Sequence, residues 1–350
     1  MKLCKVTDLK GGEVLAKTVM TSDFKILLSD GITLRSEYID KIKELGITEV
    51  YIKEDALHEK EVLLLKSNLE RVFHDKVRDV MEKHIYRQSK ELMELSQTAD
   101  SIISNILEED EIVEKIYDIK ERSSDIYEHS VNICSLAVLV ALKLKIEKNV
   151  VHDIAVGCLL HDLGLRYLEV PYTDRNMENF SKTELIEYKK HPIYGYSVLE
   201  KEVWISNLSK KIILSHHERM DGSGFPLKLK ELPYEVKIVS VCDAFDEIIC
   251  GIGCNRQKVY QAVEYLKTFK GQKFDTHIVN TFLEFTAVYP VGSKVLLSNN
   301  YIGKVVSQNR EFPDRPVIQV VRDEQGELVS NVFLIDLIKS NNIFIEKVLE

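Results

Sequence analysis

The most informative stretch of this sequence is His216-His217-Glu218-Arg219-Met220-Asp221-Gly222-Ser223-Gly224-Phe225-Pro226. The apolar residues Ile212-Ile213-Leu214 stand just before it, which is typical of the end of a buried helix. Glycines and a terminal proline then predict a loop that leaves the helix. Adjacent histidines at the end of an apolar helix are uncommon, so the stretch indicates a helix end that presents imidazoles to a site.

Other histidines and aspartates recur at intervals that fit successive helices. The spaced residues are His129, His161-Asp162, His191, His216-His217 and Asp243. The gaps between them are 32, 30, 25 and 26 residues, so helix ends could meet around a common centre. Imidazole nitrogens and carboxylate oxygens suit divalent iron, manganese, nickel or zinc better than copper(I) or a sulfur cluster. The carboxylate of Asp162 has two oxygens and can bridge two such ions.

Each of these residues alone has an ordinary structural explanation. His129 after Glu128 is typical of a surface or capping residue, and His161 closes a core-facing helix. Asp243, however, stands inside the apolar stretch 238–244, and a buried carboxylate without a partner is costly. Together the residues therefore favour a metal centre. The histidines without such neighbours, expected to be structural, are His58, His74, His84, His152 and His277.

The order of these motifs resembles the HD-GYP branch of the HD phosphohydrolase superfamily. The matching motifs are His129-Ser130, His161-Asp162-Leu163-Gly164, His191-Pro192, residues 216–226, Asp243-Ala244-Phe245-Asp246 and Gly271-Gln272-Lys273-Phe274-Asp275. The resemblance covers about residues 120–286. Residues 6–12 and 45–48 resemble a module often found ahead of this domain, and residues 289–292 resemble a small β tail that often follows it.

The resemblance implies a metal-dependent phosphodiesterase for the cyclic dinucleotide c-di-GMP. A metal-bridging hydroxide would open one 3′–5′ phosphodiester to give pGpG, and a second cut would give GMP. His161 and Asp162 would be catalytic, at a centre of two or three divalent ions, with iron or manganese favoured over zinc or nickel. The ligands that carry over are His129, His161, Asp162, His191, His216, His217 and Asp243. A further acidic ligand of trinuclear members would fall on Asp125, whose alternative role is a helix cap.

The sequence departs from the family at its basic positions. Leu165 stands where the family has a phosphate-contacting lysine, and Arg166 is turned by about 100° around a helix. Residues 252–255 lack the family's basic segment, although Arg256 follows, and Phe225 replaces the tyrosine of GYP. The substrate contacts that the resemblance implies are Arg166, Asp221, Gly222, Gly224, Phe225, Pro226 and Arg256.

Each lost charge-assisted contact would weaken phosphate binding by about ten- to a hundredfold. Two interpretations therefore stay open. The protein is a phosphodiesterase with slow or altered activity, or it is a signalling module that binds metal and nucleotide without turnover. A third, another HD-type reaction on a different substrate, is less favoured.

Glycine and proline are unevenly distributed and predict the domain organisation. No glycine stands between Gly46 and Gly157, and no proline precedes Pro171, which predicts mostly helical structure there. We expect a mainly α fold: an HD-type helical bundle with a small N-terminal α+β module and a small C-terminal β module. The predicted parts are residues 1–58 (α+β module), 59–118 (helical connector), 119–286 (HD-GYP domain) and 287–350 (β module).

Within residues 59–97 apolar residues recur at helical spacing. They include Val62, Leu65, Leu69, Val72, Phe73, Val77, Val80 and Met81. Such a stripe predicts packing against the rest of the chain or, alternatively, a homodimer formed through this helix.

Composition narrows the class of protein. With 45% apolar and 29% charged residues, the chain is neither collagen-like nor wholly disordered. Its net charge of −9 argues against binding to a DNA or RNA duplex. We expect no signal peptide, no membrane span and a cytoplasmic protein, because the longest apolar run, 131–142, is short and the six cysteines form no CxxC pair.

Overall fold

The structure, a computed structural model, describes most of the chain. The described residues are 2–15, 19–20, 26–29, 31–47, 49–52, 65, 67–87, 90–107, 117–119, 124–309, 312–329 and 332–349. The chain divides into the units Met1–Lys60 and Glu61–Glu350. Val62 of the predicted stripe and the predicted boundary at residues 58 and 59 lie outside the described residues.

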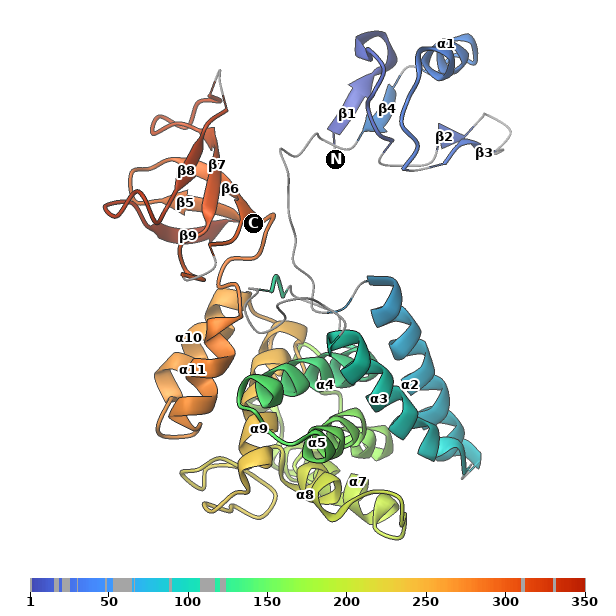
Figure 1. The fold of residues 1–350 in the computed structure, drawn as a ribbon, viewed down its shortest axis with the longest axis vertical. Helices are drawn as coiled ribbons and strands as arrows, with labels where there is room; N and C mark the ends of the chain where they lie inside the picture. Colours follow the sequence, from blue (N-terminus) through green and yellow to red (C-terminus); the bar gives the residue numbers. More distant parts are fainter. Residues whose placement is uncertain are drawn as a thin grey trace. The chain divides into compact units, whose positions relative to one another are not determined.

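The N-terminal unit is a small α+β fold, drawn in blue in Figure 1. Its elements are β1 (Lys2–Lys5), η1 (Val6–Asp8), β2 (Val19–Met20), β3 (Ile26–Leu28), α1 (Ser36–Glu44) and β4 (Glu49–Ile52). Strand β1 pairs antiparallel with β4, and β2 pairs antiparallel with β3. Ile39 and Ile42 on one face of α1 are buried with Leu15 and Leu34, which gives this unit its own core.

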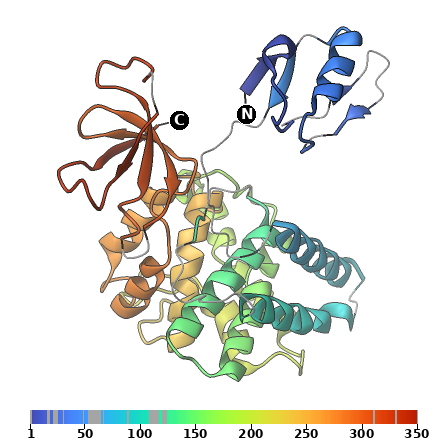
Figure 2. The same ribbon diagram turned by 45° about the horizontal axis from the view of Figure 1, so that its top comes forward.

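The second unit is built mainly of helices (Figures 1 and 2). They are α2 (Ser67–Arg87), η2 (Lys90–Met93), α3 (Glu94–Leu107), α4 (Ile126–Lys143), α5 (Lys148–Leu160), η4 (Leu163–Tyr167), η5 (Met177–Asn179), α6 (Lys182–Tyr188), α7 (His191–Leu199), α8 (Asn207–Ser215), α9 (Tyr234–Cys250), α10 (Val259–Phe269) and α11 (Thr276–Glu284). Helix α4 packs against α2, α3, α5, α9 and α11, and α8 packs against α5, α7 and α9. The predicted mainly α fold with small flanking modules is confirmed.

Helix α4 forms the centre of this bundle. Its residues from Val131 to Ala141 are all buried, and the Ser135 hydroxyl among them donates a hydrogen bond to the Val131 carbonyl oxygen. The helix is long and apolar enough to meet the length and composition criteria for a membrane span, and 83% of it is buried inside the fold. The buried core helix of a helical domain meets the same length and composition criteria.

The apolar stripe of the predicted connector faces this bundle. Phe73, Val77, Val80 and Met81 of α2 are buried in the helical core, whereas Val72 is 59% exposed. The stripe therefore packs within the chain, and a homodimer through this helix stays a prediction.

The C-terminal segment folds into an antiparallel sheet with the strand order β8-β7-β6-β5-β9. Its strands are β5 (Lys294–Leu297), β6 (Ile302–Ser307), β7 (Val317–Arg322), β8 (Leu334–Asp336) and β9 (Ile345–Leu349). Alternate residues such as Val295, Ile318 and Val320 fill its core. The buried Asp118 carboxylate accepts bonds from Val291 N and Gln308 Nε2, both at 2.8 Å.

Candidate metal centre

Each of three histidines at helix ends has one ring nitrogen tied to the backbone. His161 follows the end of α5, His191 begins α7 and His216 follows the end of α8. The Nδ1 atom of each lies 2.7–2.9 Å from the carbonyl oxygen of the residue three positions earlier. A carbonyl only accepts, so Nδ1 carries the proton and Nε2 is left as a lone-pair donor. The helix ends therefore orient three Nε2 atoms toward one centre.

Two further histidines are oriented by carboxylates. His129 of α4 has its Nδ1 2.8 Å from Asp246 Oδ2, and its Nε2 faces the centre. His217 has its Nδ1 3.3 Å from Asp243 Oδ2 and its Nε2 3.1 Å from His191 Nε2. A carboxylate that holds an imidazole as Asp246 holds His129 is typical of metal-binding histidines.

The carboxylate of Asp162 lies between two groups of donors. Its Oδ1 is 3.3 Å from His191 Nε2 and 3.6 Å from His216 Nε2. Its Oδ2 is 3.3 Å from His161 Nε2 and 3.6 Å from His129 Nε2. Two of the groups that could each hold an ion are Asp162 with His191, His216 and His217, and His129 with His161 and Asp243. The structure thus brings the seven predicted ligands of the core set together.

The donor atoms fit divalent metal ions, because several have no other partner. Among the described residues, His129 Nε2, His161 Nε2, Asp162 Oδ1 and both Asp243 oxygens are buried without a hydrogen bond. The ligand side chains are at most 4% exposed, and buried polar atoms without a partner are costly. Moreover, the Nε2 atoms of His191 and His216 lie 3.3 Å apart, both as lone-pair donors. A cation between such donors satisfies them at once.

The pKa values of the centre move in different directions. Burial would lower the pKa of His129 and His161, but the neighbouring Cys250 and the Asp243 and Asp246 carboxylates raise that of His129 well above its usual value, and Asp162 raises that of His161. Burial alone would raise the pKa of Asp162, but the neighbouring imidazoles of His161, His191 and His216 hold that pKa well below its usual range. Burial and the neighbouring His216 hold the pKa of His217 well below its usual value. An ionised carboxylate and a neutral imidazole are the forms that bind metal.

Asp125 does not join either group of donors. Its carboxylate caps α4, accepting bonds from Tyr127 N at 2.8 Å and Glu128 N at 3.0 Å. His74 Nε2 of α2 lies 3.3 Å from the same carboxylate. The cap is therefore the role that the structure supports, and a third ion at Asp125 stays a prediction.

The loop after His217 is folded tightly against the centre. Glu218 is fully buried, and its carboxylate accepts bonds from Leu227 N at 2.6 Å and Leu229 N at 2.9 Å. A Cβ at Gly224 would lie 2.4 Å from the His217 carbonyl oxygen, so only glycine fits there. The Phe225 ring stacks on the His217 ring at a centroid distance of 4.4 Å. Phe225 thus covers the most exposed ligand of the centre.

The other predicted substrate contacts in this loop have local roles. Asp221 accepts a bond from Ser223 N at 2.9 Å, and Gly222 has a φ of +79°, which favours glycine. The bond from Phe225 to Pro226 is cis. These residues form the rim of a pocket described below, and their role toward a substrate stays a prediction.

Both predicted arginines are held in ion pairs. Arg166 pairs with Glu82 of α2 through Nε at 2.8 Å and Nη2 at 3.1 Å, and the Tyr127 hydroxyl donates to the same carboxylate. Burial favours the neutral form of Glu82, but these partners lower its pKa. Arg256 Nη2 lies 3.1 Å from Asp174 Oδ2. Neither arginine is directed at the metal centre by these contacts.

Several neighbours of the centre were not predicted from the sequence. They are Glu82, Glu218, Asp246, Glu247 and Cys250. Asp246 and Glu247 follow Asp243 by about one helical turn, so helical spacing alone indicates that they approach its face. Glu82 lies 84 residues before Arg166 and gives no local signal.

Leu165 is 1% exposed and belongs to the helical core. A lysine at this position would have to bury its stem and reach outward with its ammonium group. We expect Leu165→Lys to lower stability by about 2 kcal/mol at pH 7. Burial lowers the folded-state pKa of such a lysine, so the loss should fade as the pH rises toward 10. Thermal unfolding at pH 7 and 9.5 measures the loss of stability and its pH dependence, with Leu165→Met as the control. Unchanged stability with tighter c-di-GMP binding would contradict this expectation.

The comparisons with known proteins agree with this geometry. Residues 111–278 match the HD domain family, and residues 294–350 match the KOW domain associated with HD domain. The solved structure of Bd1817, described as a HDG"Y"P protein from Bdellovibrio bacteriovorus, shares the fold with a TM-score of 0.53. It is 19% identical and covers 80% of this chain and 97% of that one. The helical bundle is thus an HD domain.

Two curated relatives are cyclic di-GMP phosphodiesterases. One is PA4108 of Pseudomonas aeruginosa, 24% identical over 245 residues, which are 69% of this chain and 59% of that protein. The other is from Thermotoga maritima, 27% identical over 271 residues, which are 73% of this chain and 70% of that protein. The chain therefore spans little more than half of the Pseudomonas relative. Residues 111–278 are thus an HD domain, and their His/Asp set is similar to that of HD-GYP proteins.

Proposed function

We propose that this protein is a metal-dependent phosphodiesterase that hydrolyses cyclic di-GMP to pGpG and, in a second step, to GMP. The observation that carries the proposal is the convergence of buried donors, with orphaned nitrogens and oxygens, around Asp162. The names of the relatives support the substrate.

In this reaction, residues of the chain would hold the metal ions and keep the imidazoles in position. Divalent ions bound at such a centre polarise a phosphodiester and provide a hydroxide near neutral pH. His191, His216 and His217 would hold one ion, and His129, His161 and Asp243 another, with Asp162 shared between them. The backbone bonds to Nδ1 keep the imidazoles in place. The burial of these side chains would keep bulk water away from a reacting phosphate.

A second candidate function is a module that binds metal and nucleotide with little or no turnover. The arginines that would contact phosphate are paired with Glu82 and Asp174, and Leu165 is buried. Without these cations, less of the negative charge on the substrate is offset. This observation favours weak activity over the rapid hydrolysis of a complete site.

One experiment separates the two candidates. The full chain is purified anaerobically, loaded with iron or manganese, and incubated with c-di-GMP while products are resolved by chromatography. We expect pGpG to accumulate, and chelation of the metal to stop it. Binding of c-di-GMP without product would overturn the phosphodiesterase in favour of the binding module. A metal-loaded protein that neither binds nor cleaves c-di-GMP would overturn both.

A further inference from the structure

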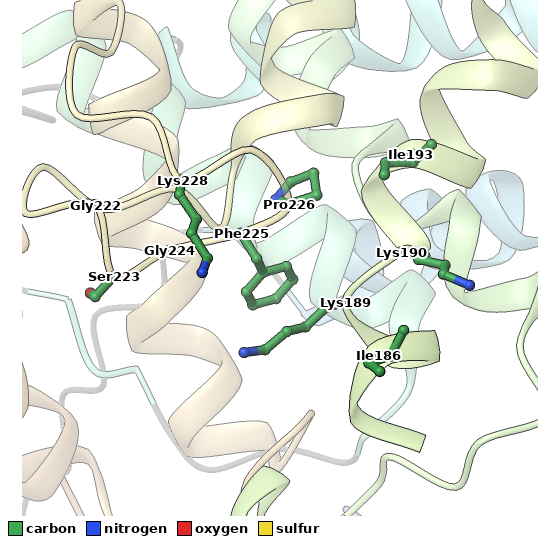
Figure 3. A pocket seen from close by; sticks show the side chains of 10 residues that line it. All are labelled: Ile186, Lys189, Lys190, Ile193, Gly222, Ser223, Gly224, Phe225, Pro226 and Lys228. Carbon is green, nitrogen blue, oxygen red and sulfur yellow. The ribbon is translucent and has the colours of Figure 1, made fainter. Parts of the chain in front are cut away.

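A pocket of about 400 Å³ opens beside the loop that covers His217 (Figure 3). Its walls are the end of α6, the start of α7 and residues 222–228. The volume lies within the range of small-molecule sites in proteins. The pocket does not contain the candidate metal ligands themselves, so it is a separate space at the edge of the centre.

The lining of this pocket is positive, although the chain as a whole is acidic. Lys189, Lys190 and Lys228 line it, and its lining includes no acidic residue, against a net charge of −9 for the chain. Lys190 is paired with Glu187 at 3.1 Å. Within the part of the chain that the structure describes, Lys189 and Lys228 have no carboxylate within 4.0 Å. Their two ammonium groups lie on the side of the Phe225 ring in Figure 3, whereas that of Lys190 points away.

Phe225 connects the pocket to the metal centre. Its ring stacks on His217, and the Lys189 ammonium lies 5.5 Å from its centroid. One side chain thus contacts both a candidate metal ligand and a cation of the pocket. On the opposite wall the apolar side chains of Ile186 and Ile193 are 60% and 38% exposed. An apolar surface beside free cations fits a ligand that carries both a planar base and a phosphate.

We infer that Lys189 and Lys228 bind the uncleaved phosphate of a cyclic dinucleotide while its scissile phosphate lies at the metal centre. The inference rests on the proposed function and names the part of the site that recognises the substrate. A cyclic dinucleotide carries two phosphodiesters on opposite sides of one ring, so it can reach both places. Lysine is a suitable point charge for phosphate. These lysines would thereby compensate for the cations missing at Leu165 and at residues 252–255.

The test compares two substrates on single-charge variants. Lys189→Gln, Lys228→Gln and the double variant are assayed with c-di-GMP and with bis(p-nitrophenyl) phosphate, a diester with a single phosphate. Lys190→Gln is the matched control, because it removes the same charge from a lysine already paired with Glu187. We expect each single variant to raise KM for c-di-GMP about tenfold, and the double variant roughly a hundredfold. The kcat and the kinetics with the small diester should stay unchanged.

The outcomes separate this inference from the function on which it rests. If the native chain cleaves c-di-GMP and the double variant keeps its KM, the lysine site is overturned and the phosphodiesterase stands. Equal losses with the small diester, or in Lys190→Gln, would also overturn it, because they indicate a general change in charge or folding. A native chain that binds c-di-GMP without cleavage is assayed by its dissociation constant in the same variants. If it does not bind c-di-GMP at all, both proposals fail.

Discussion

Asp162→Ala is expected to empty the metal centre and to lower phosphodiesterase activity by at least about a thousandfold. Asp162 is the residue whose two oxygens face both groups of donors, at 3.3 Å from His191 and 3.3 Å from His161. Its removal takes one ligand from the group with His191, His216 and His217, and it removes the negative charge beside the group with His129, His161 and Asp243. Metal content by elemental analysis and pGpG release by chromatography measure the two effects together.

The fold should survive this substitution, because the carboxylates of Asp243 and Asp246 remain as counter-charges beside the buried imidazoles of His129 and His161. Asp162→Asn serves as the variant of equal size, and it should lose metal in the same way. Asp153→Ala, a partly exposed aspartate of α5 outside the donor groups, is the control and should keep both metal and activity. If Asp162→Ala retained the metal content of the native chain, the assignment of the ligands would be wrong.

The sequence was sufficient to predict that these ligands meet, because each one stands at a helix end or on an apolar helix face. His161, His191 and His216 occupy such ends in the structure, and Asp243 is buried within α9. Successive candidate ligands are separated by about one helix and one connection, and this spacing predicts that they lie on successive helices. Helix ends are local features, so residues near in sequence determine them.

Residues whose role depends on distant partners could not be placed in this way. The sequence leaves Asp125 open between a ligand and a cap, and only the packing of α2 shows that His74 lies beside it. Arg166 is taken up by Glu82, which is far away in sequence. The lysines of the pocket become neighbours only because the loop at residues 222–228 folds back toward α6.

The strands of the C-terminal sheet could also be placed only in part from the sequence. The β-rich runs of the sequence at residues 291–297, 301–306, 316–321 and 328–334 predict four strands, and the first three runs overlap β5, β6 and β7. The expected strand at 328–334 is wrong in position, because β8 begins only at Leu334 and Leu328 forms an isolated bridge with Arg322. The last strand, β9, was not predicted, since its partly exposed residues show no clear alternation.

Gly164→Ala is expected to damage both the stability and the metal centre. A Cβ at this position would lie 1.9 Å from the His191 carbonyl oxygen and 2.8 Å from Gly195 N, and both are backbone atoms. Backbone in a packed helix contact cannot rotate away as the end of a side chain can, so η4 and α7 must separate. We expect a loss of more than about 3 kcal/mol, which corresponds to a fall in Tm of roughly 6–12 °C.

The same movement displaces His191, whose Nε2 must stay near Asp162 Oδ1 to share an ion. The Tm is measured on chelator-treated protein, so that loss of metal is not counted as loss of packing, and metal content is measured separately. Gly195→Ala is the matched control from the other side of this contact, because its nearest neighbours would lie at 3.3 Å and 3.4 Å. It should change the Tm by only a few degrees. A Gly164→Ala protein with native Tm and metal content would show that the close approach of η4 to α7 does not hold the centre together.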